Sequence, residues 1–175
     1  MTQTTSLPDL STVNRMDCNA FVNAFGSTFE HAPWVAQRAW AEGPFATVEV
    51  LHASMMNVVN RATRQMQVSF LCGHPELAGK EAEAGTMTSE SEGEQASAGL
   101  DSLNRDEIGK LRELNQRYRK RHGFPFIIAV RRYSKPEIFE KLACRSELDS
   151  DVELLEALQQ IAWITRKRID AKLSS

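Results

Sequence analysis

The sequence has few cysteines, no long apolar run and none of the common nucleotide- or zinc-binding motifs, and each shortage excludes a class of protein. Its three cysteines, Cys18, Cys72 and Cys144, are widely spaced and odd in number, so they form neither a disulfide framework nor a zinc pattern. The uninterrupted apolar runs are only a few residues long, too short for a membrane-spanning helix. No Walker loop, G-x-G-x-x-G or H-E-x-x-H motif occurs.

An excess of charge of one sign is also missing. The 21 Lys and Arg residues nearly balance the 23 Asp and Glu residues, which gives a formal net charge of −2. Such a chain has no strong field to attract nucleic acid or an anionic membrane. The segment Met1 to Pro8 is polar and lacks the apolar core of a secretory signal. We therefore expect a reduced, cytoplasmic protein with neither nucleic-acid nor membrane partners.

Polar residues that cap helices mark several helix ends. The candidates are Asn14 or Asp17 near the start, Asn104 or Asp106 in the middle, and Asp149 or Asp151 before the last helix. Ser134 and Glu137 have the S-x-x-E spacing of a capping box, and Gly123 is placed to end a helix in the left-handed conformation. With hydrophobic residues recurring at helical spacing, these signals predict about seven or eight helices and no sheet.

We therefore expect an all-α fold, a single-domain helical bundle over residues 14–173, preceded by a loose N-terminal segment, residues 1–13. The longest clear amphipathic helix is predicted over residues 45–66. His52 lies beside the apolar stripe of that helix and is interpreted as structural. On the last helix, the residues predicted to face the core are Val152, Leu155, Leu158, Ile161, Ala162 and Ile169.

The segment L-C-G-H-P-E-L-A-G-K, residues 71–80, separates a helical pattern from a polar stretch with little to bury. Pro75 fixes its own φ and keeps His74 out of the α region, so we expect the imidazole on a constrained turn rather than on a helix face. Histidine titrates nearest neutral pH and is the most common general acid or base. A loop histidine that caps a helix end or lies in solvent is the alternative, because His-Pro alone is a weak motif.

The polar stretch, residues 78–97, has two interpretations. Its small and acidic residues, including Glu81 and Glu83, are typical of a solvated linker. Its later part has polar residues that can begin a helix, namely Thr88, Ser89 or Ser91.

The stretch F-P-F-I-I-A-V, residues 124–130, is the only strongly apolar extended segment. Pro125 keeps Phe124 out of a helix. The backbone N–H and C=O groups of such a segment need partners. A ligand supplies them if the segment is a binding strand, and the core supplies them if it is a tight, buried connection.

Several motifs occur in one order along the chain. They are F-E-H-A-P-W at 29–34, G-P-F at 43–45, H-P-E-L-A-G-K at 74–80, S-E-G-E-Q at 91–95 with A-G-L at 98–100, and L-N-x-x-Y with H-G-F-P-F-I-I-A-V over 114–130. In this order and spacing the chain resembles the family of 2-oxo-4-hydroxy-4-carboxy-5-ureidoimidazoline (OHCU) decarboxylases, over about Phe21 to Leu173. Those enzymes perform the last step from urate to (S)-allantoin, and they are helical, cofactor-free and commonly homodimeric.

The resemblance implies a site, residue by residue. His74 matches the catalytic histidine, the proton donor, and Glu94 is implied as the second catalytic group. The implied substrate-binding residues are Pro75, Ser91, Glu92, Gly93, Glu94, Gln95, Phe126, Ile127, Ile128, Ala129, Val130 and Arg168, those from Phe126 to Val130 acting through their backbone. The match of Arg168 leaves Arg166 as a neighbouring candidate, and His122 stands where the family usually has Phe.

These residue types suit the chemistry that the family implies. OHCU is small, planar and anionic, and the guanidinium fork of Arg168 fits a carboxylate. Gln95 can donate and accept, and Glu94 can accept from a ring or ureido N–H or orient His74. The ring C=N can take the electron pair left by CO2, so the reaction requires no cofactor. A proton from His74 would then set the (S) configuration.

Two other classes of protein remain open. A helical interaction module would bind a partner helix or peptide in an apolar groove, with residues 79–95 as a linker. An ordered segment that brings Glu94 towards His74 would instead favour an enzyme. A metal-dependent hydrolase that uses His74, Glu76 and Glu94 lacks a second ligating histidine. We expect a decarboxylase with a small-molecule substrate, no metal, and a homodimeric assembly.

Overall fold

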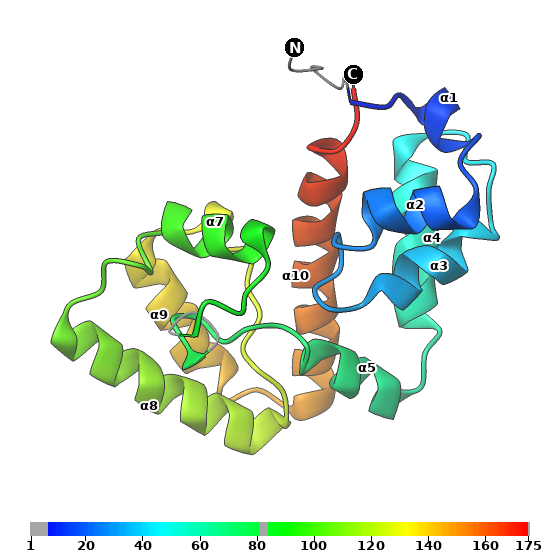
Figure 1. Ribbon diagram of the computed structural model, residues 1–175. Coiled ribbons are helices and arrows are strands. Elements are labelled where there is room, and N and C mark those ends of the chain that lie inside the picture. Colours follow the sequence, from blue (N-terminus) through cyan, green and yellow to red (C-terminus); the bar gives the residue numbers. More distant parts are fainter. Residues whose placement is uncertain (1–6, 81–83, 175) are drawn as a thin grey trace, which may run out of the picture. The chain divides into compact units, whose positions relative to one another are not determined.

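Helices make up every regular element in the part of the chain that the computed structural model describes, residues 7–80 and 84–174 (Figure 1). These residues contain nine α-helices, one 3-10 helix and no strand, which confirms the all-α class. The elements are α1 (Leu10–Val13), α2 (Cys18–Phe25), α3 (Pro33–Trp40), α4 (Val48–Asn60), α5 (Arg64–Leu71), α7 (Ser89–Ser97), α8 (Arg105–His122), η1 (Val130–Arg132), α9 (Lys135–Arg145) and α10 (Ser150–Asp170). None of these helices combines the length and apolar character that a membrane crossing needs.

The chain folds into two compact units. The first contains the described residues up to Thr63 and those from Ile164 onward, and the second contains Arg64–Trp163. Helix α10 supplies residues to both. The expected division into a loose segment, residues 1–13, and one domain, residues 14–173, stays a prediction.

In the first unit α2 packs on α3, and α3 packs on α4 (Figure 1). Of the two predicted caps for α2, Asp17 is the one used, and its carboxylate accepts a backbone N–H of the first turn at 2.8 Å. Asn14 instead bonds both backbone groups of Phe45, each at 2.8 Å. The rings of Phe21 and Phe25, one turn apart on α2, are fully buried with their centroids 5.0 Å apart. Apolar side chains at helical spacing therefore form the core of this unit.

The N-terminal segment that was expected to be loose contains the one-turn helix α1. Asp9 caps this helix, because its Oδ1 accepts the N–H of Thr12 at 2.8 Å. Val13, at the end of α1, is buried. The described part of this segment thus contains one turn of helix, while residues 1–6 lie outside the described residues.

The helix predicted over residues 45–66 is two helices, α4 and α5. Thr47 caps α4 by accepting a backbone N–H from its first turn at 3.3 Å, so the helix begins only after it. Beyond its end, the N–H of Ala62 bonds the carbonyl of Val59 at 3.1 Å, in a tighter turn than the α-helix makes. Neither Gly nor Pro marks this break in the sequence, so the hydrophobic pattern runs through it.

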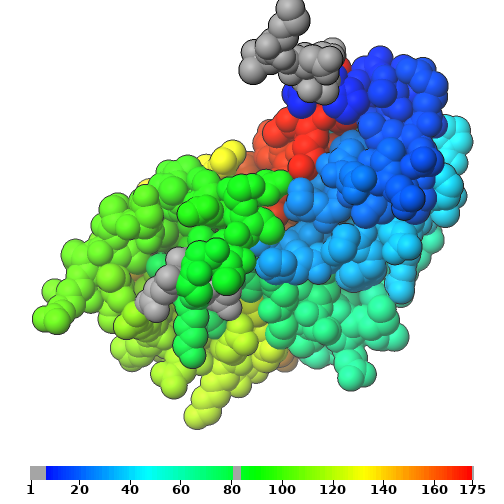
Figure 2. Space-filling view, in the orientation of Figure 1, coloured from blue at the N-terminus to red at the C-terminus, as the bar shows by residue number. Residues whose placement is uncertain are grey.

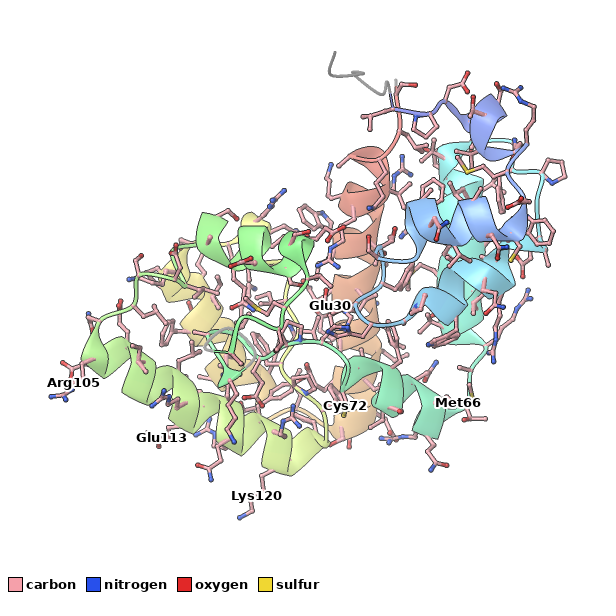
Figure 3. The ribbon with its side chains drawn as sticks, viewed as in Figure 1. Glu30, Met66, Cys72, Arg105, Glu113 and Lys120 are labelled. Atoms are coloured by element: carbon pink, nitrogen blue, oxygen red, sulfur yellow. The ribbon has the colours of Figure 1, made fainter. Side chains whose placement is uncertain are left out.

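In the second unit α8 packs against α9. Asn104 caps α8 in a reciprocal capping box, and Gly123 ends it in the left-handed conformation at φ 83°, both among the predicted helix ends. The outer face of α8 is polar, and Arg105, Glu113 and Lys120 point away from the unit (Figure 3). In the space-filling view, α7 and α8 (green) form much of the visible surface of this unit (Figure 2).

The two remaining helix starts also follow local rules. The predicted capping box of Ser134 and Glu137 opens α9, with the Ser134 N–H donating to the Glu137 carboxylate at 2.8 Å. Asp149, one of the two predicted candidates, precedes α10 and accepts the N–H of Asp151 at 2.8 Å. These contacts span two or three residues, which is why the sequence predicts them.

Near the start of α10, the buried face differs from the predicted one. Val152 and Leu155 are 55% and 64% exposed, so their predicted burial is wrong. Three residues are buried as predicted, namely Leu158, Ile161 and Ile169. Glu153 occupies an inward position instead, because its carboxylate pairs with the buried guanidinium of Arg145. A prediction from hydrophobic spacing assigns only apolar residues to the buried face, so it cannot place Glu153 there.

Candidate functional site

His74 lies on a turn that directly follows α5, as Pro75 predicts. The N–H of His74 donates to the carbonyl of Leu71 at 3.0 Å, and the chain then leaves the helix. The imidazole is only 6% exposed, and it meets the ring of Phe70 edge-on with the centroids 5.6 Å apart. Ala78 closes the turn in the left-handed conformation, at φ 44°. A solvent-exposed loop histidine is therefore excluded, and the ring is held against the end of α5.

Gln95 of α7 holds this turn through both ends of its carboxamide. Its Oε1 accepts the N–H of Ala78 at 2.9 Å, and its Nε2 donates to the carbonyl of Glu76 at 3.3 Å. Gln95 is 7% exposed, so these bonds form largely out of reach of water, where hydrogen bonds are stronger. The helix that carries Glu94 is thus attached directly to the turn that carries His74.

Two residues of α8 hold the same turn. The buried Asn115 donates from Nδ2 to the carbonyl of Leu77 at 3.1 Å. Arg119 pairs with Glu76, with 2.7 Å between Nε and Oε1. Together with Gln95, these contacts fix three successive residues of the turn. No role for Asn115 is predicted from the sequence, where its only signal is a polar side chain on the apolar stripe of α8.

The S-x-x-E-Q spacing places three side chains on one face of α7. Ser91 and Gln95 are one turn apart and buried, and Glu94 beside them is partly buried. Glu92 and Gly93 are exposed. The helix thus divides the five residues of the predicted binding segment into an inward group and an outward pair.

Helix α7 is set in place by a cap and by packing. Thr88, one of the three predicted starts, accepts the N–H of Ser91 at 3.3 Å. The helix packs against η1 as well as against the His74 turn. Its described residues therefore form a docked helix rather than a solvated linker. Glu81 and Glu83 of the acidic run lie outside the described residues.

All seven residues of the predicted extended segment, residues 124–130, are buried; they form no strand, and Val130 already begins η1. The carbonyl of Ile127 accepts from Nη1 of Arg145 at 3.0 Å, and the N–H of Ala129 donates to Oε1 of Gln160 at 3.0 Å. Side chains of α9 and α10 thus satisfy two of the peptide groups in this segment. Neither Arg145 nor Gln160 was predicted from the sequence, because both act on a segment distant from them along the chain.

A buried network supports Arg145. Its Nε lies 3.0 and 3.1 Å from the two carboxylate oxygens of Glu153, and the Tyr118 hydroxyl donates to the same carboxylate. Burial, together with the Glu153 carboxylate, raises the pKa of Tyr118 far above its usual value, so its hydroxyl remains a donor. The guanidinium also lies over the ring of Phe126, 4.5 Å from its centroid. Both charges of the ion pair therefore have hydrogen-bonding partners.

His122, which stands where the family usually has Phe, fits at the end of α8. Its Nδ1 and Nε2 lie 2.9 Å from the Ser150 hydroxyl and 3.1 Å from the Arg145 carbonyl. Its ring centroid is 4.6 Å from that of Tyr118. Burial lowers the pKa of His122 below its usual value, so the neutral ring is favoured.

Three contacts bring most of the predicted site residues together within the second unit. Gln95 joins α7 to the His74 turn, and α7 packs against η1 at the end of the extended segment. At the other end, the thiol of Cys72, which lies just after α5 and is labelled in Figure 3, donates to the carbonyl of Gly123 at 3.4 Å. The turn that carries His74, the helix that carries Glu94 and the extended segment are therefore connected by direct contacts, although they are far apart in sequence.

Arg168 belongs to the first unit, where it forms a buried ion pair. Its Nη1 lies 3.2 Å from the carboxylate of Glu30 and 3.3 Å from the carbonyl of Thr28 (Glu30 is labelled in Figure 3). The neighbouring Arg166 is more exposed and pairs with two carboxylates, including Glu49. The two arginines thus have different environments, and the assignment of Arg168 to the substrate stays a prediction.

The alternative metal site would group His74, Glu76 and Glu94. Glu76 is paired with Arg119 instead. Across residues 7–80 and 84–174, no group of three or more His, Cys, Asp or Glu side chains is arranged to hold a metal ion.

Known proteins resemble this chain over nearly its whole length. The family model described as OHCU decarboxylase matches residues 14–170. A 2-oxo-4-hydroxy-4-carboxy-5-ureidoimidazoline decarboxylase of Haloferax volcanii is 40% identical over 166 residues, which cover 95% of this chain and 96% of that protein. The uric acid degradation bifunctional protein of Bacillus subtilis is 37% identical over 157 residues, 90% of this chain and 31% of that protein. The crystal structure of an (S)-allantoin synthase superposes with a TM-score of 0.75 at 25% identity, over 94% of this chain and 54% of that one.

Proposed function

The chain belongs to the OHCU decarboxylase family of carboxy-lyases in urate degradation, and we propose that it converts OHCU to (S)-allantoin and CO2 without a cofactor. The observation that carries this proposal is the attachment of α7 to the His74 turn by Gln95. This contact joins the turn that carries His74, the proposed proton donor, to the helix that carries Glu94, the proposed carboxylate. A partner-binding linker would have no reason to be held to this turn by a buried carboxamide.

Substrate binding is assigned to the extended segment and the inward face of α7. The planar ring lies against residues 126–130, whose peptide groups offer donors and acceptors to its edge. Ser91 and Pro75 flank the ring, and Glu94 accepts a hydrogen bond from a ring or ureido N–H. The assignments of Glu92 and Gly93, which are exposed on α7, and of Gln95, whose carboxamide already bonds the turn, rest on the family resemblance.

Carbon dioxide leaves in the first chemical step. The site holds the carboxylate out of the ring plane, so the electrons of the breaking C–C bond align with the ring π system. The adjacent C=N bond accepts this pair, which gives the substrate its own electron sink. Pyridoxal phosphate or thiamine supplies such a sink in other decarboxylases. Arg168 is the predicted partner of the substrate carboxylate, since a guanidinium fork matches its two oxygens.

Protonation completes the reaction and sets the stereochemistry. His74 delivers a proton to one face of the ureido-bearing carbon. The neighbouring ring hydroxyl becomes a carbonyl as its proton passes to the nitrogen that took the electron pair, which yields the (S) product. An imidazole is suited to this step because it exchanges protons near neutral pH. Packing against Phe70 and the Pro75 turn limits the ring to few orientations, so the proton arrives from a defined direction.

The decisive experiment generates OHCU in situ from urate and follows circular dichroism as the protein is added. The expected result is rapid formation of (S)-allantoin, with no loss of rate when a chelator is present. Slow, racemic allantoin formation equal to the uncatalysed reaction would refute the proposal. Loss of the rate with chelator, restored by added metal, would favour the metal-dependent alternative.

We also propose that the chain forms a homodimer, as the family resemblance implies, and that it is cytoplasmic, as its sequence composition predicts. Light scattering on the purified chain should give twice the mass expected from its 175 residues. Fractionation of the source cells should recover the protein with cytoplasmic markers. A monomer that is fully active would remove the dimer from this proposal while leaving the decarboxylase assignment intact.

A further inference from the structure

The extended segment is held from α9 and α10 at two peptide groups that are two residues apart. The carbonyl of Ile127 is bonded by Arg145, and the N–H of Ala129 is bonded by Gln160, each at 3.0 Å. All four residues are buried. Both bonds are therefore formed out of water, and both link this segment to neighbouring helices.

The spacing of these two bonds fixes which peptide groups face the opposite way. In a planar trans peptide, the C=O of one residue and the N–H of the next point in opposite directions. The C=O of Ile127 points to Arg145 and the N–H of Ala129 points to Gln160. The N–H of Ile128 must then point away from Arg145, and the C=O of Ile128 away from Gln160. Among the described residues, no hydrogen bond to either of these two groups is found, although Ile128 is only 4% exposed.

Both holding side chains are themselves fixed in orientation. Arg145 uses one edge of its guanidinium for Glu153, and this leaves Nη1 directed at Ile127. Gln160 donates from Nε2 to the carboxylate of Glu156 at 2.7 Å, so its oxygen faces Ala129. The Arg145 guanidinium and the Gln160 carboxamide are thus each held by a second hydrogen-bonding partner. The two side chains that bond the segment therefore have fixed orientations.

We propose that Arg145 and Gln160 are positioning residues that set the backbone register so that the Ile128 N–H and C=O bind the substrate ring. This inference rests on the proposed function. A buried donor and acceptor on one residue cost free energy when unpaired, and a cyclic urea or lactam edge, with adjacent N–H and C=O, satisfies both. The chemical class recognised at this point is therefore a cyclic urea or lactam. A register slip of one residue would present the groups of Ile127 or Ala129 instead.

Gln160 provides the sharper test, because replacing Arg145 would leave the Glu153 charge buried and unpaired. Gln160→Met keeps the length of the side chain but removes the acceptor for Ala129. The matched control exchanges two residues, Gln160→Glu with Glu156→Gln, which keeps an acceptor at position 160 and a carboxamide–carboxylate pair. Glu156→Gln alone is the second control.

For Gln160→Met we expect KM for OHCU to rise about tenfold, as the loss of one buried hydrogen bond implies, with a smaller fall in kcat. The exchanged pair should restore KM to within about twofold of the unchanged protein, and the thermal midpoint of each variant shows that it is folded. An unchanged KM in folded Gln160→Met would refute the proposal. Failure of the exchanged pair to restore KM would also refute it, because the effect would then not follow the acceptor.

Amide shifts give a direct measure of the register in the unchanged protein. When (S)-allantoin is added, the amide proton of Ile128 should shift more than those of Ile127 and Ala129. A larger shift at either neighbour, or no shift at Ile128, would refute the assigned register. If the unchanged protein forms no (S)-allantoin in the assay above, the proposed function itself fails. If it forms (S)-allantoin and only these tests fail, the register alone is wrong.

Discussion

Gln95 and Ala78, 17 positions apart, are joined by a hydrogen bond of 2.9 Å from the backbone N–H of Ala78 to the carboxamide oxygen of Gln95. The other end of the carboxamide bonds the carbonyl of Glu76. This one side chain thus attaches the short polar helix α7 to the turn that carries His74. The arrangement of the proposed acid–base residues depends on it.

Replacing His74 with Asn tests the proton donor. Asn keeps polarity and similar size but has no titratable proton, and general acid catalysis is typically worth ~10²–10⁴-fold, so we expect kcat to fall by that order. The measurement is the initial rate of (S)-allantoin formation. His31→Asn is a matched control, because His31 is exposed and has φ 50°, a conformation that Asn tolerates. A variant that keeps both the original kcat and the stereochemistry would exclude His74 as the donor.

Replacing Gln95 with Leu tests the attachment of α7. The substitution keeps most of the volume but leaves the Ala78 N–H and the Glu76 carbonyl without their partner. We expect the free energy of unfolding to fall by about 1–3 kcal/mol, with a lower kcat because the His74 turn is no longer fixed. Denaturant titration and the rate assay measure the two effects.

The control for this substitution is Ala96→Gln, on an exposed position of the same helix. It should change neither quantity. A Gln95→Leu protein of undiminished stability and activity would contradict the role assigned to the carboxamide.

Glu94→Ala tests the carboxylate that is placed beside the substrate. We expect KM to rise and kcat to fall together, since the group is assigned to both binding and orientation. Glu113→Ala, on the exposed face of α8, removes the same charge elsewhere in this unit and should alter neither constant. If Glu94→Ala has the kinetics of this control, Glu94 is not part of the site.

The pKa of His122 gives the protein a stability that depends on pH. Burial lowers this pKa from the usual 6.5, so the unfolded chain takes up a proton at a higher pH than the folded one. The contribution of the neutral ring is therefore complete above pH 6.5 and is lost as the pH falls through the folded pKa. In His122→Phe, the loss of stability between pH 7 and pH 5 should be smaller than in the unchanged protein, as measured by thermal midpoints across this range. Equal slopes would show that other groups cause the pH dependence.

Short-range interactions account for most of what the sequence predicts. Asp17, Asn104 and Ser134 each begin a helix through bonds that span two or three residues, and Gly123 ends one in the left-handed conformation. Pro75 restricts the residue before it, which predicts that His74 lies on a turn. Such features need no knowledge of the rest of the fold, because both partners lie within one turn of the chain.

Contacts over long distances along the chain account for what the sequence does not predict. Glu153 is buried because its carboxylate bonds Arg145 and Tyr118. At the start of α10 the buried face therefore includes Glu153, whereas Val152 is exposed. The bond from Gln160 to Ala129 crosses 31 positions. A side chain that bonds a distant backbone group has no periodicity or spacing of its own, so the positioning residues of the site emerge only from the fold.

The composition of α7 favours helix only weakly, and this affects local unfolding. This nine-residue helix contains Gly93 and three serines and buries only Ser91 and Gln95, so little besides its docking keeps it helical. Its backbone amides should exchange with deuterium through local openings that leave α8 intact. Each such opening would uncouple Glu94 from the His74 turn, and the lifetime of the competent site would then be set by one helix rather than by global unfolding.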